Sequence, residues 1–198
     1  MAVQLGPLKK ITAPAVEPLV EMAQLSDAAR ALLKPGMPVR SYLAALIEAD
    51  LVTDALRLLA YALPKREAVW WACLCARQAQ PEPPNPLDME IIKASEAWVY
   101  RPHDQTRRAA MDLAMKTSFD RAAHWPAAAA FWSGGSIAPP DAPPVEPGES
   151  LTGNAVVGAV LLAVVQPDAK AAEQKRRRFL SQALDIANGG DGRKAASA

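Results

Sequence analysis

Apolar residues recur at helical spacing along most of the chain, and prolines, glycines and acidic residues separate the periodic segments. The most regular pattern follows Pro38, where apolar residues three and four positions apart would share one helix face. These residues are Tyr42, Leu43, Leu46 and Ile47. The next segment, 53–63, is apolar on nearly all sides apart from Arg57, which predicts a central, buried helix. Pro64 ends that segment, and a third helix is expected to follow at once, to about Gln78.

Similar patterns predict the remaining helices, and no segment shows the alternation that is typical of a strand. The expected ranges are about 19–33, 87–100, 103–118, 120–132, 152–165 and 168–188. In the first of these, Ser26 and Asp27 offer a cap or a break inside the helix. In the helix over 103–118, Ala110 and Ala114 should face inward, and Arg107 and Arg108 outward. Short turns between the helices over 41–78 make them antiparallel neighbours. We therefore predict an all-α fold, a compact irregular bundle of about eight helices.

Prolines divide the chain into a helical domain and its connectors. Residues 1–18 contain three prolines and no lasting period, so we expect an extended N-terminal arm. A single helical domain is expected over 19–190, with proline-rich connectors at 81–86 and 134–150. The longer connector should either wrap the surface or be mobile. Residues 191–198 should form a disordered tail.

Composition and charge indicate the general class of protein. The 198 residues are 51% hydrophobic and carry a net charge of +1, which fits a globular protein and argues against a dedicated nucleic-acid binder. Met1–Lys10 has no secretory signal pattern, and the longest apolar run, Ala155–Val165, is about half of the ~20 residues that span a bilayer. We therefore predict a cytoplasmic protein without a membrane partner. Cys73 and Cys75 are expected to be small buried thiols.

No motif in the sequence predicts catalysis or a bound cofactor. The spacings of zinc ligands, phosphate-binding glycine loops and the setting of a nucleophilic serine are all absent from the sequence. We therefore predict no metal, no cofactor, no small-molecule substrate and no catalytic residue. The enzymatic alternative is an unknown reaction that uses His103 or His124 with a carboxylate from a different helix.

Tryptophans and one basic run supply the candidate binding residues. Five tryptophans among few other aromatic residues favour an exposed groove for a partner protein, and we expect Trp71 and Trp132 to line it. The basic run at 175–178 would place Arg176 and Arg177 at the rim, where they attract an acidic partner. The alternative for this run is weak nucleic-acid binding, which the lack of interleaved aromatic residues makes less favourable.

Three stretches resemble an uncharacterised family of bacterial proteins. They are PVRSYLAALIEADLVTDALRLLAYA at 38–62, LPKREAVWWACLCAR at 63–77, and the proline-rich stretch that leads into LTGNAVVGAVLLAVV at 151–165. The family has no assigned activity, and some of its members accompany type VI secretion genes. The resemblance implies a bacterial cytoplasmic accessory protein and supplies no catalytic residues. Together these observations predict a non-enzymatic protein-interaction module, an adaptor or chaperone that serves a bacterial secretion system.

Overall fold

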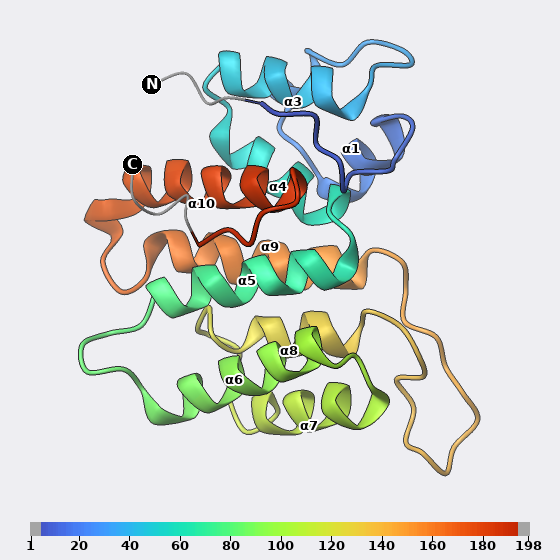
Figure 1. Cartoon of the computed structure of the whole chain (residues 1–198), viewed down its shortest axis with the longest axis vertical. Helices are drawn as coiled ribbons and strands as arrows, with labels where there is room; N and C mark the ends of the chain where they lie inside the picture. Colours follow the sequence, from blue (N-terminus) through green and yellow to red (C-terminus); the bar gives the residue numbers. More distant parts are fainter. Residues whose placement is uncertain (1–4, 194–198) are drawn as a thin grey trace. The chain divides into compact units, whose positions relative to one another are not determined.

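Helices are the regular elements of the part of the chain that the structure, a computed structural model, describes: residues 5–193 (Figure 1). The prediction of an all-α fold is confirmed. No single helix in this part is long and apolar enough to cross a membrane. In chain order the elements are α1 (Glu17–Ala23), α2 (Asp27–Arg30), α3 (Val39–Glu48), α4 (Val52–Ala62), α5 (Lys65–Gln78), α6 (Pro86–Tyr100), α7 (Asp104–Ala114), α8 (Trp125–Phe131), α9 (Leu151–Val165), the 3-10 helix η1 (Ala169–Ala171) and α10 (Ala172–Ala187).

The chain divides into two compact units. The prediction of a single helical domain over 19–190 did not include this division. The discontinuous unit combines Met1–Pro64 with Ala172–Ala198, and it therefore holds α1 to α4 together with α10. The continuous unit is Lys65–Ala171, and it holds α5 to α9 and η1. The proline that ends the most apolar segment of the sequence, Pro64, is thus also the boundary between the units.

Helix α4 is the centre of the discontinuous unit, as its apolar pattern predicted. Helices α1, α3 and α10 each pack against it, and eight of its eleven residues are buried. One buried residue of α4 is polar: Asp54 accepts hydrogen bonds from the backbone N–H of Ser26 at 2.8 Å and from the Ser26 hydroxyl at 3.0 Å. Ser26 also caps α2 by accepting from Ala29 N–H. The helix expected over 19–33 is therefore interrupted at this serine.

The N-terminal arm is tied to the discontinuous unit through its backbone. Leu8 N–H donates to Asn188 Oδ1 at 2.8 Å, and Lys10 N–H donates to the carbonyl of Ala187 at 2.9 Å, so the arm satisfies polar groups at the end of α10. The Arg40 guanidinium of α3 donates to two arm carbonyls, those of Leu5 and Gly6. Of the disordered tail predicted at 191–198, residues 194–198 lie outside the described residues.

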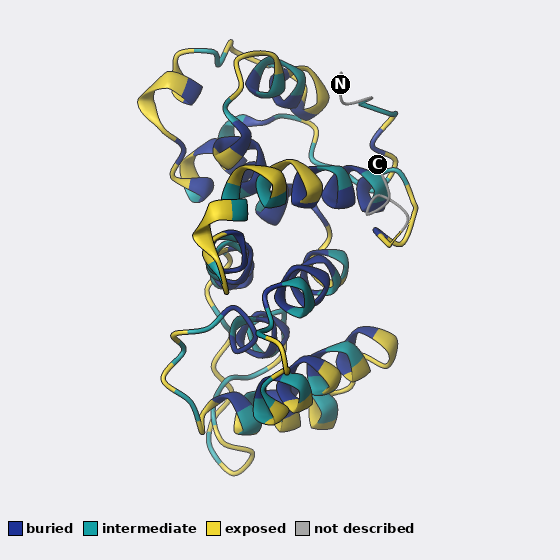
Figure 2. Cartoon of the chain, turned by 90° about the vertical axis from the view of Figure 1, so that its left-hand side faces the viewer, coloured by how far each residue is buried: buried dark blue, intermediate teal, exposed yellow. Residues whose placement is uncertain are grey.

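Helix α8 occupies the corresponding central place in the continuous unit. It packs against α5, α6, α7 and α9, and its four consecutive alanines, Ala127–Ala130, are completely buried. Because an alanine side chain is a single methyl group, the neighbouring helices can approach α8 closely. Figure 2 shows buried positions gathered on one face of several helices, with exposed positions on the opposite face. The alanine-rich composition therefore serves close helix packing.

A glycine makes the contact between α8 and α9 possible. A Cβ atom at Gly158 of α9 would lie 3.0 Å from the indole ring of Trp125, closer than side chains normally pack. The Trp125 indole N–H in turn donates to the carbonyl of Phe119 at 2.9 Å. This indole therefore joins α9 to the segment that precedes α8.

The segment between α7 and α8 is less helical than the pattern predicted. Helix α7 ends at Ala114 and α8 begins at Trp125, so residues 115–124 form turns where helices were expected over 103–118 and 120–132. The Thr117 hydroxyl donates to the carbonyl of Ala114, and Phe119 adopts a left-handed φ of 56°. Local side-chain hydrogen bonds of this kind compete with a continuing helix.

Candidate functional site

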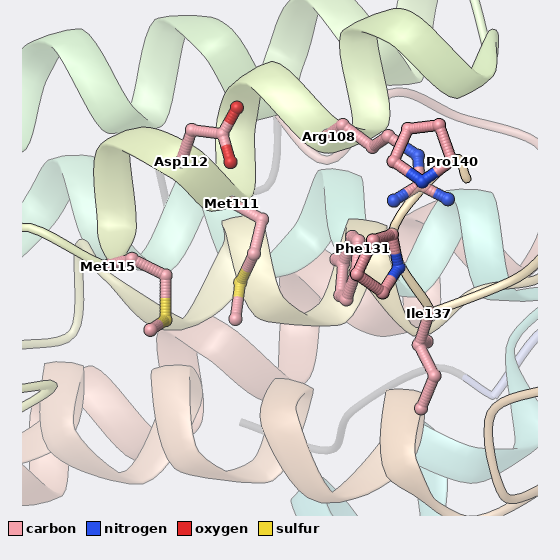
Figure 3. Close-up of a pocket in the computed structure, with 8 residues that line it drawn as sticks. Arg108, Met111, Asp112, Met115, Phe131, Ile137 and Pro140 are labelled. Carbon is pink, nitrogen blue, oxygen red and sulfur yellow. The ribbon is translucent and has the colours of Figure 1, made fainter. Parts of the chain in front are cut away.

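An open pocket lies on the continuous unit between α7, the end of α8 and the proline-rich loop, which we define as residues 132–150. Its volume is about 440 Å³. Met111 of α7 and Met115, the residue that follows α7, project to the same side, four positions apart (Figure 3). Met115 is 65% exposed, so the pocket presents an apolar, flexible side chain to solvent. The lining consists of Arg108, Met111, Asp112, Met115, Phe131, Ile137, Pro139 and Pro140.

A buried arginine holds the wall of this pocket in place. The sequence predicted that Arg107 faces outward, but the structure buries it, and this prediction was wrong. Its guanidinium donates to the carbonyl of Phe131 at 2.5 Å, to the carbonyl of Ser136 at 2.8 Å and to the Asp104 carboxylate. A buried guanidinium is tolerated when its N–H groups find such acceptors. Arg107 therefore connects α7, the end of α8 and the proline-rich loop.

A second arginine and an aromatic ring complete the wall. Arg108 donates to Asp104 at 2.8 Å and to the carbonyl of Ser136 at 2.8 Å. The guanidinium carbons of Arg107 and Arg108 lie 4.8 and 5.9 Å from the centroid of the Phe131 ring, within the range of a cation–π interaction. These contacts fix the orientation of Phe131, the aromatic residue that lines the pocket.

Asp104 and Gly135 both lie against this arginine pair. Hydrogen bonds from Arg107 and Arg108 hold the pKa of Asp104 below its ordinary value, so this carboxylate stays charged at neutral pH. Gly135 has a φ of +68°, and a Cβ atom there would lie 3.3 Å from the Arg107 guanidinium. A side chain at position 135 would therefore be strained and would crowd Arg107.

A buried cluster of charged groups joins α6 to the start of α8. His124 Nε2 lies 3.1 Å from Asp88 Oδ1, and Arg121 Nε lies 2.9 Å from the other carboxylate oxygen of Asp88. His124 Nδ1 is buried without a hydrogen-bond partner and lies 3.7 Å from Asp120 Oδ1. His124 and Asp88 are 3% and 2% exposed. The cluster thus brings one positive side chain and one imidazole to a carboxylate inside the unit.

The cluster meets one condition of the enzymatic alternative. His124 does pair with a carboxylate from a different helix, and that carboxylate, Asp88, was not identified from the sequence. The imidazole offers almost no surface to a substrate, however, and it is not among the residues that line the pocket. His103 is exposed at the start of α7, where its backbone N–H donates to Thr106 Oγ1.

Comparison with protein families gives one match. The model of a family of unknown function (DUF6931) matches residues 42–187, which is most of the chain. The chain belongs to this family. The predicted resemblance to an uncharacterised family is thereby confirmed, while its link to bacterial secretion stays a prediction. Comparisons with curated proteins and with solved structures give no match.

The part of the chain that carries the family match includes the whole continuous unit and much of the discontinuous unit. The match begins at Tyr42 in α3 and ends at Ala187, the last residue of α10. The pocket, the proline-rich loop and the His124 cluster therefore all lie within the family region. The N-terminal arm, α1 and α2 lie outside it.

The two tryptophans predicted to bind a partner differ in exposure. Trp71 of α5 is completely buried (0% exposed), so it presents no surface to a partner, and we correct that prediction. The middle of α5 is buried on all sides, because every residue from 71 to 76 is buried. Trp132, the residue that follows α8, is partly exposed, and its carbonyl accepts a hydrogen bond from the Thr152 hydroxyl. The neighbouring Phe131, not Trp132, lines the pocket.

The two arginines of the basic run are paired with acidic residues. Arg176 donates to Glu173 at 2.6 Å, and Arg177 contacts both Glu173 at 2.8 Å and Asp50 at 2.9 Å. Hydrogen bonds from Arg176 lower the pKa of Glu173, and Asp50 raises the pKa of Arg177. Because these carboxylates offset much of the positive charge, the run offers weaker attraction to nucleic acid than its sequence suggests. Arg176 and Arg177 stay predicted partner-binding residues.

The two thiols allow a direct test of how well the continuous unit is packed. Both Cys73 and Cys75 are completely buried, and burial raises the pKa of the Cys73 thiol well above its ordinary value. We expect neither to react with a thiol reagent in the folded protein at about pH 8, and both to react after unfolding in guanidinium. Labelling followed by mass spectrometry would measure this. Rapid labelling of the folded protein would contradict the buried packing of α5.

Proposed function

We propose that this protein is a non-enzymatic protein-interaction module and that the pocket beside Met111 and Met115 is its docking site. The observation that supports this proposal is an open, largely apolar pocket whose rim carries a highly exposed methionine. Its volume of about 440 Å³ falls within the range of binding sites. Unbranched methionine side chains adapt their shape to different apolar surfaces, and binding proteins use them for that purpose.

The chemistry of the lining favours docking over catalysis. The lining residues include no histidine, thiol or hydroxyl group, and the guanidinium of Arg108 is already bonded to Asp104 and to the Ser136 carbonyl. Asp112 is exposed at the edge. The pocket therefore offers apolar contact with one carboxylate beside it, which suits an apolar side chain of another protein.

Two substitutions directly after α7 separate a docking role from a general surface effect. Met115→Glu places a charge in the pocket, whereas Lys116→Glu changes the charge of the next residue, which does not line the pocket. Both side chains are exposed, so neither change should destabilise the fold by more than about 0.5 kcal/mol. Affinity purification from native cells, with quantitative mass spectrometry, should recover a partner with the wild-type and Lys116→Glu proteins and lose it with Met115→Glu.

The same experiment tests the finer predictions. Trp132→Ala reports whether the half-buried tryptophan contributes to the docking surface. A double change of Arg176 and Arg177 to glutamine reports whether the discontinuous unit attracts the partner. Equal recovery of the partner with Met115→Glu and a second pocket variant, Met111→Glu, would exclude the pocket as the docking site. A secretion-system component as the partner would support the proposed role of an adaptor or chaperone accessory to bacterial secretion.

A further inference from the structure

The second half of the proline-rich loop, residues 143–147, has features of a peptide ligand. It reads Pro-Pro-Val-Glu-Pro and contains neither helix nor turn. Pro143, Pro144 and Glu146 are exposed, and Val145 is 50% exposed. We propose that this segment, the displayed arm, is a docking motif for a partner protein whose groove is lined with aromatic side chains and flanked by basic ones. This goes beyond the pocket, which the displayed arm does not line.

The sequence of the displayed arm favours an extended, polyproline-type backbone. Each proline fixes its own φ near −65°, and a residue that precedes proline is also driven towards extended conformations. Three of the five residues are prolines, and Pro143 and Glu146 each precede one. Aromatic-lined grooves bind such segments because the backbone loses little conformational freedom on binding. The spacing Pro144-x-x-Pro147 is the pattern that these grooves recognise.

Hydrogen bonds to the first half of the loop hold the displayed arm in position. Ser136 Oγ accepts from the N–H groups of Ala138 at 3.1 Å and Val145 at 3.0 Å, and Ile137 N–H donates to the carbonyl of Val145 at 2.8 Å. The carbonyl of Ser136 is in turn bound by Arg107 and Arg108. The backbone of Val145 is therefore fixed while its side chain stays half exposed. A segment ordered before binding costs less entropy to capture.

Charge identifies the kind of groove that would fit. The loop carries three exposed acidic residues, Asp141, Glu146 and Glu149, and its sequence from 137 to 149 contains no lysine or arginine. These carboxylates flank the prolines on both sides. A partner groove with basic residues at its edges would complement them, whereas an acidic groove would be repelled. This charge also disfavours nucleic acid and anionic membrane surfaces as partners of the loop.

Site-specific photo-crosslinking in the full chain tests the proposal. The photoreactive amino acid benzoylphenylalanine would replace Val145, whose backbone N–H and carbonyl make the hydrogen bonds to the first half of the loop. Lys93 on α6 would serve as the exposed control position. After irradiation of native cells, we expect a protein adduct from position 145 and not from position 93. The crosslinked partner peptide should lie beside tryptophan, tyrosine or phenylalanine residues and beside lysine or arginine.

Variants of the displayed arm decide whether the adduct depends on its chemistry. Replacing Pro144 and Pro147 by alanine should lower the adduct yield about fivefold. Changing Glu146 and Glu149 to lysine should have an effect of similar size, and because both side chains are exposed this variant tests the proposal even if the proline variant unfolds. Met115→Glu should leave the adduct unchanged, so failure of the pocket and failure of the displayed arm are distinguishable.

Several results would overturn the proposal. The proposal is wrong if position 145 gives no more adduct than position 93, or if neither set of substitutions changes the adduct yield. It is also wrong if the adduct contains nucleic acid or lipid. A crosslink to a partner surface without aromatic residues would overturn it as well. An adduct whose partner peptide lies beside aromatic and basic residues, and whose yield falls with both sets of substitutions, would support the proposal.

Discussion

Replacing Asp88 by alanine is expected to lower the free energy of unfolding of the continuous unit by about 3 kcal/mol. Asp88 is buried, and its two oxygens face His124 and Arg121. Removal of the carboxylate would leave the His124 imidazole without its partner and the Arg121 charge without a counter-charge. Arg121 is one-third exposed and can turn towards water. The expected loss of stability is therefore near the lower end of the range for breaking a buried ion pair. Guanidinium unfolding followed by circular dichroism would measure the change.

Two control variants separate the charge of Asp88 from its position. Asp88→Asn keeps an oxygen within reach of His124 but removes the charge, so its effect should be smaller, about 1 to 2 kcal/mol. Glu90→Ala removes an exposed carboxylate from the same helix and should change stability by less than about 0.5 kcal/mol. If Asp88→Ala were no more destabilising than Glu90→Ala, the cluster would not contribute to stability.

Replacing Arg107 by methionine is expected to release the proline-rich loop and to destabilise the continuous unit by about 2 to 3 kcal/mol. Methionine retains much of the apolar stem but offers no N–H group. The carbonyls of Phe131 and Ser136 would each lose a hydrogen bond, and Phe131 would lose its nearer guanidinium. The lost bond to Asp104 adds little, because that carboxylate is largely exposed and stays hydrated.

Hydrogen exchange would show whether the effect reaches the loop. The N–H groups of Ile137, Ala138 and Val145 make the hydrogen bonds that close the loop, and their exchange should be faster in Arg107→Met. Arg108→Met is the matched control. Arg108 is more exposed and shares the Ser136 carbonyl with Arg107, so its loss should have a smaller effect. Equal exchange in the wild type and Arg107→Met would show that Ser136 closes the loop without the arginine.

The sequence predicted the helices well where apolar spacing and local end signals agree. The stripe at Tyr42 and Leu46 and the apolar surface of α4 correspond to buried positions in the structure. Local patterns were incomplete where residues far apart in sequence meet. The sequence offered Ser26 as a cap or a break within the helix expected over 19–33, and the structure has it as the cap of α2. Its hydrogen bonds to Asp54, however, span 28 positions, so no local pattern contains them.

The site was harder to predict than the fold because it depends on contacts between segments. Arg107 looks like a surface residue in the pattern of α7, and its acceptors at Phe131 and Ser136 become visible only when the loop is in place. The pair of methionines at helical spacing, Met111 and Met115, was a signal in the sequence that could have identified the pocket. Trp71 was assigned to a surface from its residue type and from its position next to Trp70, and its burial shows that these two criteria do not decide which indole is exposed.

The division of the chain into units has a consequence for the order of folding. All contacts that build the continuous unit lie within Lys65–Ala171, so it can form during synthesis as soon as that stretch has left the ribosome. The discontinuous unit must wait, because α10 packs on α4 and binds the arm at Lys10 across more than a hundred residues. Until α10 is made, the part of α4 that α10 covers stays exposed to solvent. In the nascent chain, this part of α4 is an apolar surface that a general chaperone can bind.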